Sequence, residues 1–225
     1  MKNAHIFVLL CTFCILPSVR AQQAEFDEFK KAAGGYAALY SGKVEENYNQ
    51  NKFLNHPYWG VSELREGAVC YNGRLYSDVQ LRYDTYQKCL IVATPEKRTI
   101  MQADMRKVDY FIMDGLKFIP RGDRFAALLF DSPQMRLMQY LVTAVDVQVQ
   151  KDNRFYGQFK KKVYFVLHKD GIDRTITSRS GFLKLFPTYK KQLKAYCRQE
   201  HLDFGEDNRA RSMAMLAEYA DSLIH

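Results

Sequence analysis

Short segments of alternating apolar and polar residues follow one another between residues 67 and 177. Alternation with a period of two is typical of strands that bury one face. Residues 67–95 form the centre of this pattern and predict three successive strands. Asn72-Gly73 predicts the tight turn between the first two, because both residues tolerate positive φ. Asp114-Gly115 predicts a second hairpin, and further strands are expected over residues 99–103, 108–113, 116–120, 125–130, 137–149, 155–168 and 174–177.

After Ser178 the pattern changes to helical spacing. Ser180 is expected to cap the backbone amides at a helix start. Tyr189, Leu193 and Cys197 then recur at intervals of four beside several Lys and Arg residues, which predicts an amphipathic helix. A second helix is expected over residues 207–223. Helices of this kind usually cover one face or one end of a sheet.

These elements indicate an α+β fold that is mainly β, with an antiparallel sheet, half-barrel or sandwich of about 9–10 strands and two C-terminal helices. We expect residues 39–225 to form a single β-rich domain, with its helical segment at 180–224. Residues 22–38 are expected to form an N-terminal arm or a short helix. A chain of this size can bury about 70% of its unfolded surface, which suffices for one core.

The first 21 residues have the pattern of a signal peptide. Lys2 precedes an apolar run from Ile6 to Leu16, and Val19-Arg20-Ala21 fits a cleavage site. The run has about half of the roughly 20 residues that a membrane span requires. We therefore expect an exported protein of the periplasm or outer envelope, with no transmembrane segment after the signal is removed.

The chain is moderately basic. Its net charge of +8 falls to +6 without residues 1–21, which contain two basic residues and no acidic one. Because exported proteins rarely meet nucleic acid, we expect no nucleic-acid partner, and instead an envelope protein or a lipid or glycan component. Lys160-Lys161-Lys162 is either a solvated strand entry that protects an edge or a contact for anionic headgroups. The basic C-terminal helix likewise leaves membrane or partner binding as an alternative.

Three cysteines, Cys70, Cys89 and Cys197, follow the predicted cleavage site. The odd number leaves at least one thiol free or paired between molecules. Cys70 and Cys89 lie on strands that are expected to be close, so a disulfide between them is one interpretation. No cysteine has a second ligand at the short spacing of metal sites, and no metal site is predicted.

No catalytic or cofactor motif is recognisable, and neither a catalytic residue nor a cofactor is predicted. The best candidates for ligand or partner contact are His56, Tyr58 and Trp59, in a loop that Pro57 stiffens. Arg82 and Asp84 are further candidates, since they point to the same side of one strand. Their row of polar side chains is either part of a binding surface or the solvent face of the sheet.

The motifs resemble those of a family of exported proteins of Gram-negative bacteria whose activity is uncharacterised. Tyr71-Asn72-Gly73, Tyr76 and the segment Val79-x-Leu81-x-Tyr83-Asp84 carry the resemblance, together with the lysine-rich C-terminal helical segment. The resemblance implies an envelope location and a shared fold, and it carries no chemistry across.

Three functions remain open from the sequence. The preferred hypothesis is a non-enzymatic module that binds a partner protein or an envelope component. The first alternative is a periplasmic carrier of a lipid or other apolar ligand, which would need an apolar cavity. The second alternative is a hydrolase of envelope glycans or peptides, which would need a cleft that brings His56 or His168 near a carboxylate of raised pKa.

Overall fold

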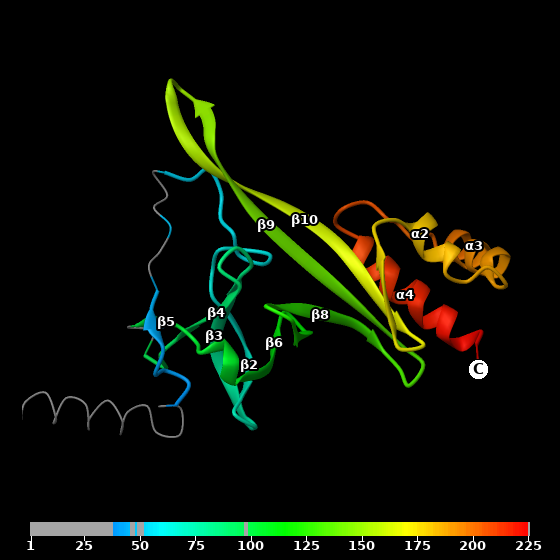
Figure 1. Cartoon of the computed structure of the whole chain (residues 1–225), viewed down its shortest axis with the longest axis horizontal. Coiled ribbons are helices and arrows are strands. Elements are labelled where there is room, and N and C mark those ends of the chain that lie inside the picture. The colour runs from blue at the N-terminus through cyan, green and yellow to red at the C-terminus, as the bar shows by residue number, and fades with distance from the viewer. Residues whose placement is uncertain (1–37, 46–47, 49–51, 97–98, 225) are drawn as a thin grey trace, which may run out of the picture.

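The computed structural model describes residues 38–45, 48, 52–96 and 99–224 of the chain. Within them, eleven strands form one open antiparallel sheet, followed by three α-helices (Figure 1). The predicted class, α+β and mainly antiparallel β, is confirmed, with one more helix and slightly more strands than expected. The signal peptide and the arm at 22–37 lie outside the described residues.

The order of the strands in the sheet is β1-β5-β4-β3-β2-β6-β7-β8-β9-β10-β11. From β6 onward each strand pairs with the next, as hairpins do. The turn predicted at Asn72-Gly73 is confirmed, with φ of 51° and 73°, and so is the one at Asp114-Gly115, with φ of 51° and 75°. The strands are β1 (Lys43–Val44), β2 (Arg65–Tyr71), β3 (Arg74–Asp84), β4 (Cys89–Ala93), β5 (Ile100–Gln102), β6 (Val108–Met113), β7 (Leu116–Arg121), β8 (Arg124–Asp131), β9 (Met135–Lys151), β10 (Arg154–Lys169) and β11 (Ile172–Ile176).

The main apolar core lies against the strands of the N-terminal half. Alternate residues of β3, such as Leu81 and Tyr83, point into it. Phe111 of β6 and Phe118 of β7 stack in its centre with 4.5 Å between ring centroids. Figure 1 shows these strands gathered at one end of the molecule.

A second core joins the other end of the sheet to the helices α2 (Arg179–Lys184), α3 (Lys190–Gln199) and α4 (Arg209–Ser222). Leu137 of β9 and Leu167 of β10 face Leu216 of α4 within it. The predicted cap at Ser180 is wrong by two residues, because the Ser178 hydroxyl accepts the Gly181 amide at 3.2 Å. The extended backbone of Ser178 gives that hydroxyl the geometry of an N-cap.

The hairpin of β9 and β10 connects the two ends (Figure 1). Its strands have 17 and 16 residues, whereas β8 pairs with β9 only over residues 136–139 and β11 pairs with β10 only over residues 165–169. The far half of the hairpin therefore extends past both neighbouring strands and reaches the N-terminal half. There the Thr143 and Thr85 hydroxyls lie 2.5 Å apart.

None of the described helices has the length and apolar character that crossing a membrane requires.

Candidate functional site

Residues 57–59 extend the sheet beside the end of β3. The Trp59 amide donates to the Tyr83 carbonyl at 2.9 Å, and the Thr85 amide donates to the Pro57 carbonyl at 3.2 Å. The Thr85 hydroxyl donates to the same Pro57 carbonyl at 2.5 Å. The loop that the sequence predicts is therefore fixed to the sheet through its own backbone.

Alternation along this segment sends Tyr58 and Trp59 to opposite sides. Trp59 packs edge-on against Phe118 of the main core, with 4.9 Å between ring centroids. Tyr58 lies on the other face of the sheet, where it is 4% exposed and contacts Cys89 and Ile91 of β4. Only Tyr58 is thus directed to the face that carries Arg82.

A buried ion pair occupies this face. The Arg82 guanidinium donates to the Glu45 carboxylate and to the Ser62 carbonyl, each at 2.6 Å, and the two charged side chains are 11% and 2% exposed. The same guanidinium lies 4.0 Å from the centroid of the Tyr58 ring. The Tyr58 hydroxyl also donates to Glu45 at 3.1 Å. Paired and stacked in this way, the arginine is held in one orientation.

Asp84 is a third buried charge, and it is 1% exposed. One carboxylate oxygen accepts the amides of Tyr86 and Gln87 at 2.8 Å, which closes the turn after β3. The other oxygen accepts the Tyr48 hydroxyl at 2.8 Å. Three hydrogen bonds thus replace the water that the carboxylate loses on burial.

Lys161 of β10 brings a fourth charge to the site. Its ammonium donates to the Tyr58 carbonyl at 2.7 Å. Burial lowers the pKa of Lys161, and the charge of Asp84 opposes that shift. The two cations, Arg82 and Lys161, balance the two anions, Glu45 and Asp84, so these four groups together have no net charge.

Aromatic rings form the adjoining wall. Phe53 stacks on Phe159 of β10 with 4.9 Å between centroids, and Tyr48 packs edge-on against both. The Asn55 amide group fixes this contact, because it donates to the Phe159 carbonyl and accepts the Phe159 amide, each at 2.8 Å. Gly157 permits the approach, since a Cβ there would lie 2.5 Å from the Phe53 ring.

A cavity of about 630 Å³ opens between the ion pair and the aromatic wall. Aromatic and aliphatic side chains make up half of its lining, and polar side chains make up the other half. The lining residues are Tyr48, Phe53, Leu54, Asn55, His56, Tyr58, Ser62 and Arg82.

His56 is a titratable residue of the lining with an unsatisfied buried atom. Its ring stacks on Tyr58 with 5.7 Å between centroids, and its Nδ1 is buried without a hydrogen-bond partner among the described residues. Burial lowers the pKa of His56, the charges of Lys161 and Arg82 lower it further, and Glu63 opposes the shift. The neutral imidazole is therefore favoured, with one ring nitrogen left to bind a ligand group.

The phenols of the site are held in their protonated form. Burial raises the pKa of both Tyr48 and Tyr58, and the nearby carboxylates raise them further. At neutral pH the site consequently presents ring faces, hydroxyl groups and a neutral imidazole beside compensated charges. This combination suits the binding of a molecule that has both an apolar face and polar groups.

The structure brings together most of the residues that the sequence singles out for contact. His56, Tyr58 and Arg82 line the cavity, and Asp84 lies behind it and holds Tyr48. Trp59 lies outside the cavity, in the main core. From the sequence, the polar row on β3 is interpreted either as part of a binding surface or as the solvent face of the sheet. In the structure the segment containing Tyr58 covers this face, so Asp84 is removed from solvent while Arg82 lines the cavity.

Sequence reasoning missed the other members of the site. Tyr48, Phe53 and Asn55 fall in a stretch that looks like a polar loop, although its two aromatic rings were a signal of packing. Glu45 carried no signal at all. Lys161 was grouped with its neighbours, yet alternation turns it to the opposite side from Lys160, which pairs with Asp146.

Cys70 and Cys89 do not form the disulfide that the sequence left open, since both are buried free thiols. Cys70 pairs with Leu75 at one end of β3, and Cys89 pairs with Asp84 at the other. Those nine positions along a strand correspond to about 30 Å. A disulfide needs Cα atoms within about 7 Å, so the distance rules out the bond.

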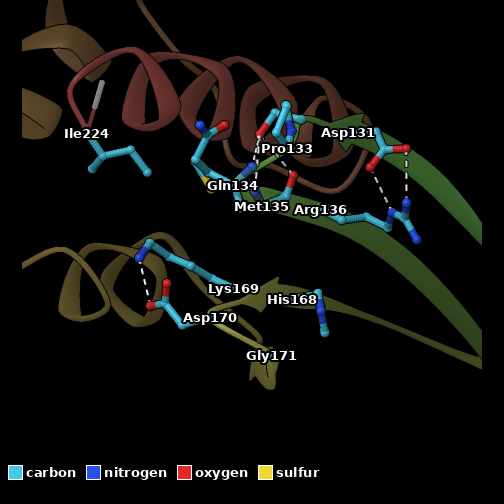
Figure 2. Close-up of a pocket in the computed structure, with 11 residues that line it drawn as sticks. Asp131, Pro133, Gln134, Met135, Arg136, His168, Lys169, Asp170, Gly171 and Ile224 are labelled. Carbon is cyan, nitrogen blue, oxygen red and sulfur yellow. Dashed lines mark hydrogen bonds and ion pairs between the residues drawn. The ribbon is translucent and has the colours of Figure 1, made fainter.

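A second cavity of about 590 Å³ lies between the β8–β9 turn, the β10–β11 turn and the end of α4. Figure 2 shows that its cations turn toward neighbouring acids: Arg136 contacts Asp131 at 2.8 Å, and Lys169 contacts Asp170 at 2.8 Å. His168 pairs with Asp173 at 2.6 Å, and both side chains are about half exposed. These contacts occupy the charged and ionisable side chains of the lining.

The described residues contain no group of three or more His, Cys, Asp or Glu side chains that could hold a metal ion. No protein-family model, curated protein or solved structure matches the chain. The family resemblance drawn from the motifs therefore stays a prediction, and the geometry of the cavity is the basis for a functional proposal.

Proposed function

We propose that this protein is an exported binding module of the cell envelope, and that its ligand occupies the cavity beside Arg82 and Tyr58. The observation that carries the proposal is His56 Nδ1, a buried hydrogen-bonding atom that lines this cavity without a protein partner among the described residues. A buried polar atom of this kind is costly unless something binds to it. A ligand group or an ordered water would satisfy it.

The size of the cavity indicates the class of ligand. About 630 Å³ falls within the range of roughly 300 to 1,000 Å³ that small-molecule sites occupy. Ring faces on one wall and hydrogen-bonding groups on the other favour a compact, partly polar envelope component, such as a sugar or a short peptide. Binding requires no catalytic group, and none is assigned.

A carrier of purely apolar cargo is the weaker alternative. Arg82, His56, Asn55 and Ser62 all line the cavity. An acyl chain placed against them would exclude water from polar groups without replacing its hydrogen bonds, which costs free energy. The lining therefore favours a ligand that can form hydrogen bonds.

Native mass spectrometry of the protein purified without detergent from its own cells tests the proposal. Leu54→Trp fills the mouth of the cavity from a side chain that is 37% exposed, and Leu75→Trp is the matched control on β3, at a residue outside the cavity lining that is 53% exposed. We expect a small bound mass that is lost on denaturation, present in the wild type and in the control and absent from Leu54→Trp.

A second measurement covers a ligand that is lost during purification. Neutral saccharides, short peptides and fatty acids are added to the purified protein, and its melting temperature is followed. Saturation at a hundred times Kd stabilises a protein by about 2.7 kcal/mol, which such a scan detects. The proposal fails if neither a bound mass nor a thermal shift is found, or if Leu54→Trp binds as well as the control does.

A further inference from the structure

Helix α3 carries a row of exposed cations along one flank. Leu193 and Cys197 are buried in the second core, and Tyr196 stacks on Tyr219 of α4 with 4.1 Å between centroids. The remaining residues of the helix are exposed and, apart from Ala195, polar, and its sequence contains no acidic residue. The exposed cations are Lys190, Lys191, Lys194 and Arg198.

Helical spacing collects these cations on one side. Positions 190, 194 and 198 follow one another at intervals of four, and at about 100° per residue all four lie within an arc of about 100°. None of the four forms an ion pair or a side-chain hydrogen bond within the part of the chain that the structure describes. No acidic side chain of the described residues thus pairs directly with these cations.

The helix itself gains little from this arrangement, since only Arg198 in the last turn is placed favourably for the helix dipole. Like charges four residues apart destabilise a helix. Lys190 and Lys191 also stand in the first turn, at the positive end of the helix dipole, where no acidic residue balances them. Helix stability therefore does not explain the row of cations, whereas an external anionic surface would.

We propose that α3 docks the protein on an anionic membrane surface. The shape of the molecule permits this contact, because α3 lies at the outer end of the long axis (Figure 1). Several separate lysines with no exposed apolar anchor are characteristic of contact with anionic headgroups, and lysine is depleted at the centres of protein interfaces. Because the apolar side of α3 is buried in the core, the helix adsorbs to the headgroups without inserting.

Sedimentation with lipid vesicles tests this proposal separately from ligand binding in the cavity. The probes are phosphatidylcholine vesicles with and without phosphatidylglycerol. We expect binding at low ionic strength only to the vesicles that contain phosphatidylglycerol. Binding should be lost at about 1 M salt, where the Debye length is about 3 Å.

Two triple variants with the same change in net charge locate the surface. Lys190→Gln, Lys191→Gln and Lys194→Gln neutralise α3, and Lys151→Gln, Arg154→Gln and Lys162→Gln neutralise exposed residues of the β9–β10 hairpin. Glutamine preserves helix propensity. We expect the α3 variant to lose about a hundredfold in vesicle affinity, since each cation contributes about fivefold. The hairpin variant should bind nearly as well as the wild type.

Three results would overturn the proposal. The first is the absence of binding to anionic vesicles at low ionic strength. The second is an equal loss in both triple variants, which would assign the effect to net charge alone. The third is equally tight binding of a DNA oligonucleotide with the same dependence on α3, which would make the face a general polyanion surface. Circular dichroism and thermal melting verify that each variant is folded.

Discussion

A few polar side chains fix the walls of the cavity. Asp84 and Gln87 both link the turn after β3 to Tyr48, and Asn55 hydrogen-bonds both backbone groups of Phe159. Each of these polar side chains replaces hydrogen bonds that burial would otherwise remove. Substitutions here should therefore have effects out of proportion to the number of atoms changed.

Gly157→Ala tests how tightly the aromatic wall is packed. The added Cβ would lie 2.5 Å from the Phe53 ring, and we expect a loss of about 1 to 3 kcal/mol in the free energy of unfolding. Urea denaturation measures this loss. In a protein that already carries Phe53→Ala, Gly157→Ala should change the free energy of unfolding little, because the obstructing ring is absent. Gly181→Ala in α2 is the control, since its Cβ would meet no atom closer than 3.5 Å.

His56 should make the protein less stable in mild acid. Because burial lowers its folded pKa, the unfolded chain binds the proton more tightly, and stability falls as pH drops below the unfolded value of about 6.5. His56→Phe keeps a ring over Tyr58 and cannot titrate. We expect the urea midpoint of the wild type to fall between pH 7 and pH 5 by more than that of the variant. Parallel pH profiles would contradict this assignment.

At the scale of elements, the three helices cover apolar side chains that the strands expose at one end of the sheet. Leu137 and Leu167 alternate out of β9 and β10 toward the helices, and Leu216 of α4 meets them. Alternation in strands and the period of 3.6 in helices thus supply matching apolar surfaces. The helices are an integral part of the domain.

Leu216→Ala should lower the free energy of unfolding by about 2 to 5 kcal/mol, because the side chain is fully buried and its removal leaves a cavity. Glu218→Ala, on the exposed side of the same helix, should change it by less than about 0.5 kcal/mol. Chemical denaturation of both variants measures the difference. Equal effects would mean that α4 is not part of the cooperative unit.

At the scale of the whole molecule, one open sheet carries its two largest apolar cores at separate ends, and the β9–β10 hairpin extends from one to the other. The cavity lies where the far half of that hairpin meets the N-terminal strands, through Phe159 and Lys161. Helix α3 lies at the other end of the molecule (Figure 1). Ligand binding and membrane docking are therefore assigned to separate surfaces.

The intact mass of the protein tests both the predicted signal peptide and the free thiols. We expect cleavage after Ala21 and three free thiols, since Cys70, Cys89 and Cys197 are unpaired. Alkylation of the denatured protein without reductant should add three groups, which intact-mass spectrometry detects. Retention of residues 1–21 would contradict the predicted export signal, and one added group would indicate a disulfide.

The local elements were determined by the sequence itself. Asn72-Gly73 and Asp114-Gly115 form the expected hairpins because few residue pairs accept positive φ twice in succession. Strand and helix positions follow from apolar periodicity, which depends only on neighbours along the chain. The same rule placed Arg82 and Asp84 on one face. It missed α2 as a separate helix, because six residues are too few to show a period.

Tertiary structure alone decided what covers the face of β3 that carries Arg82 and Asp84. Glu45, Tyr58, Arg82 and Lys161 come from four separate parts of the chain, and no local pattern specifies that their charges compensate one another. The separation of Cys70 from Cys89 likewise depends on strand register. Register and loop docking are set by packing between distant segments, so the cavity exists only once the chain is folded.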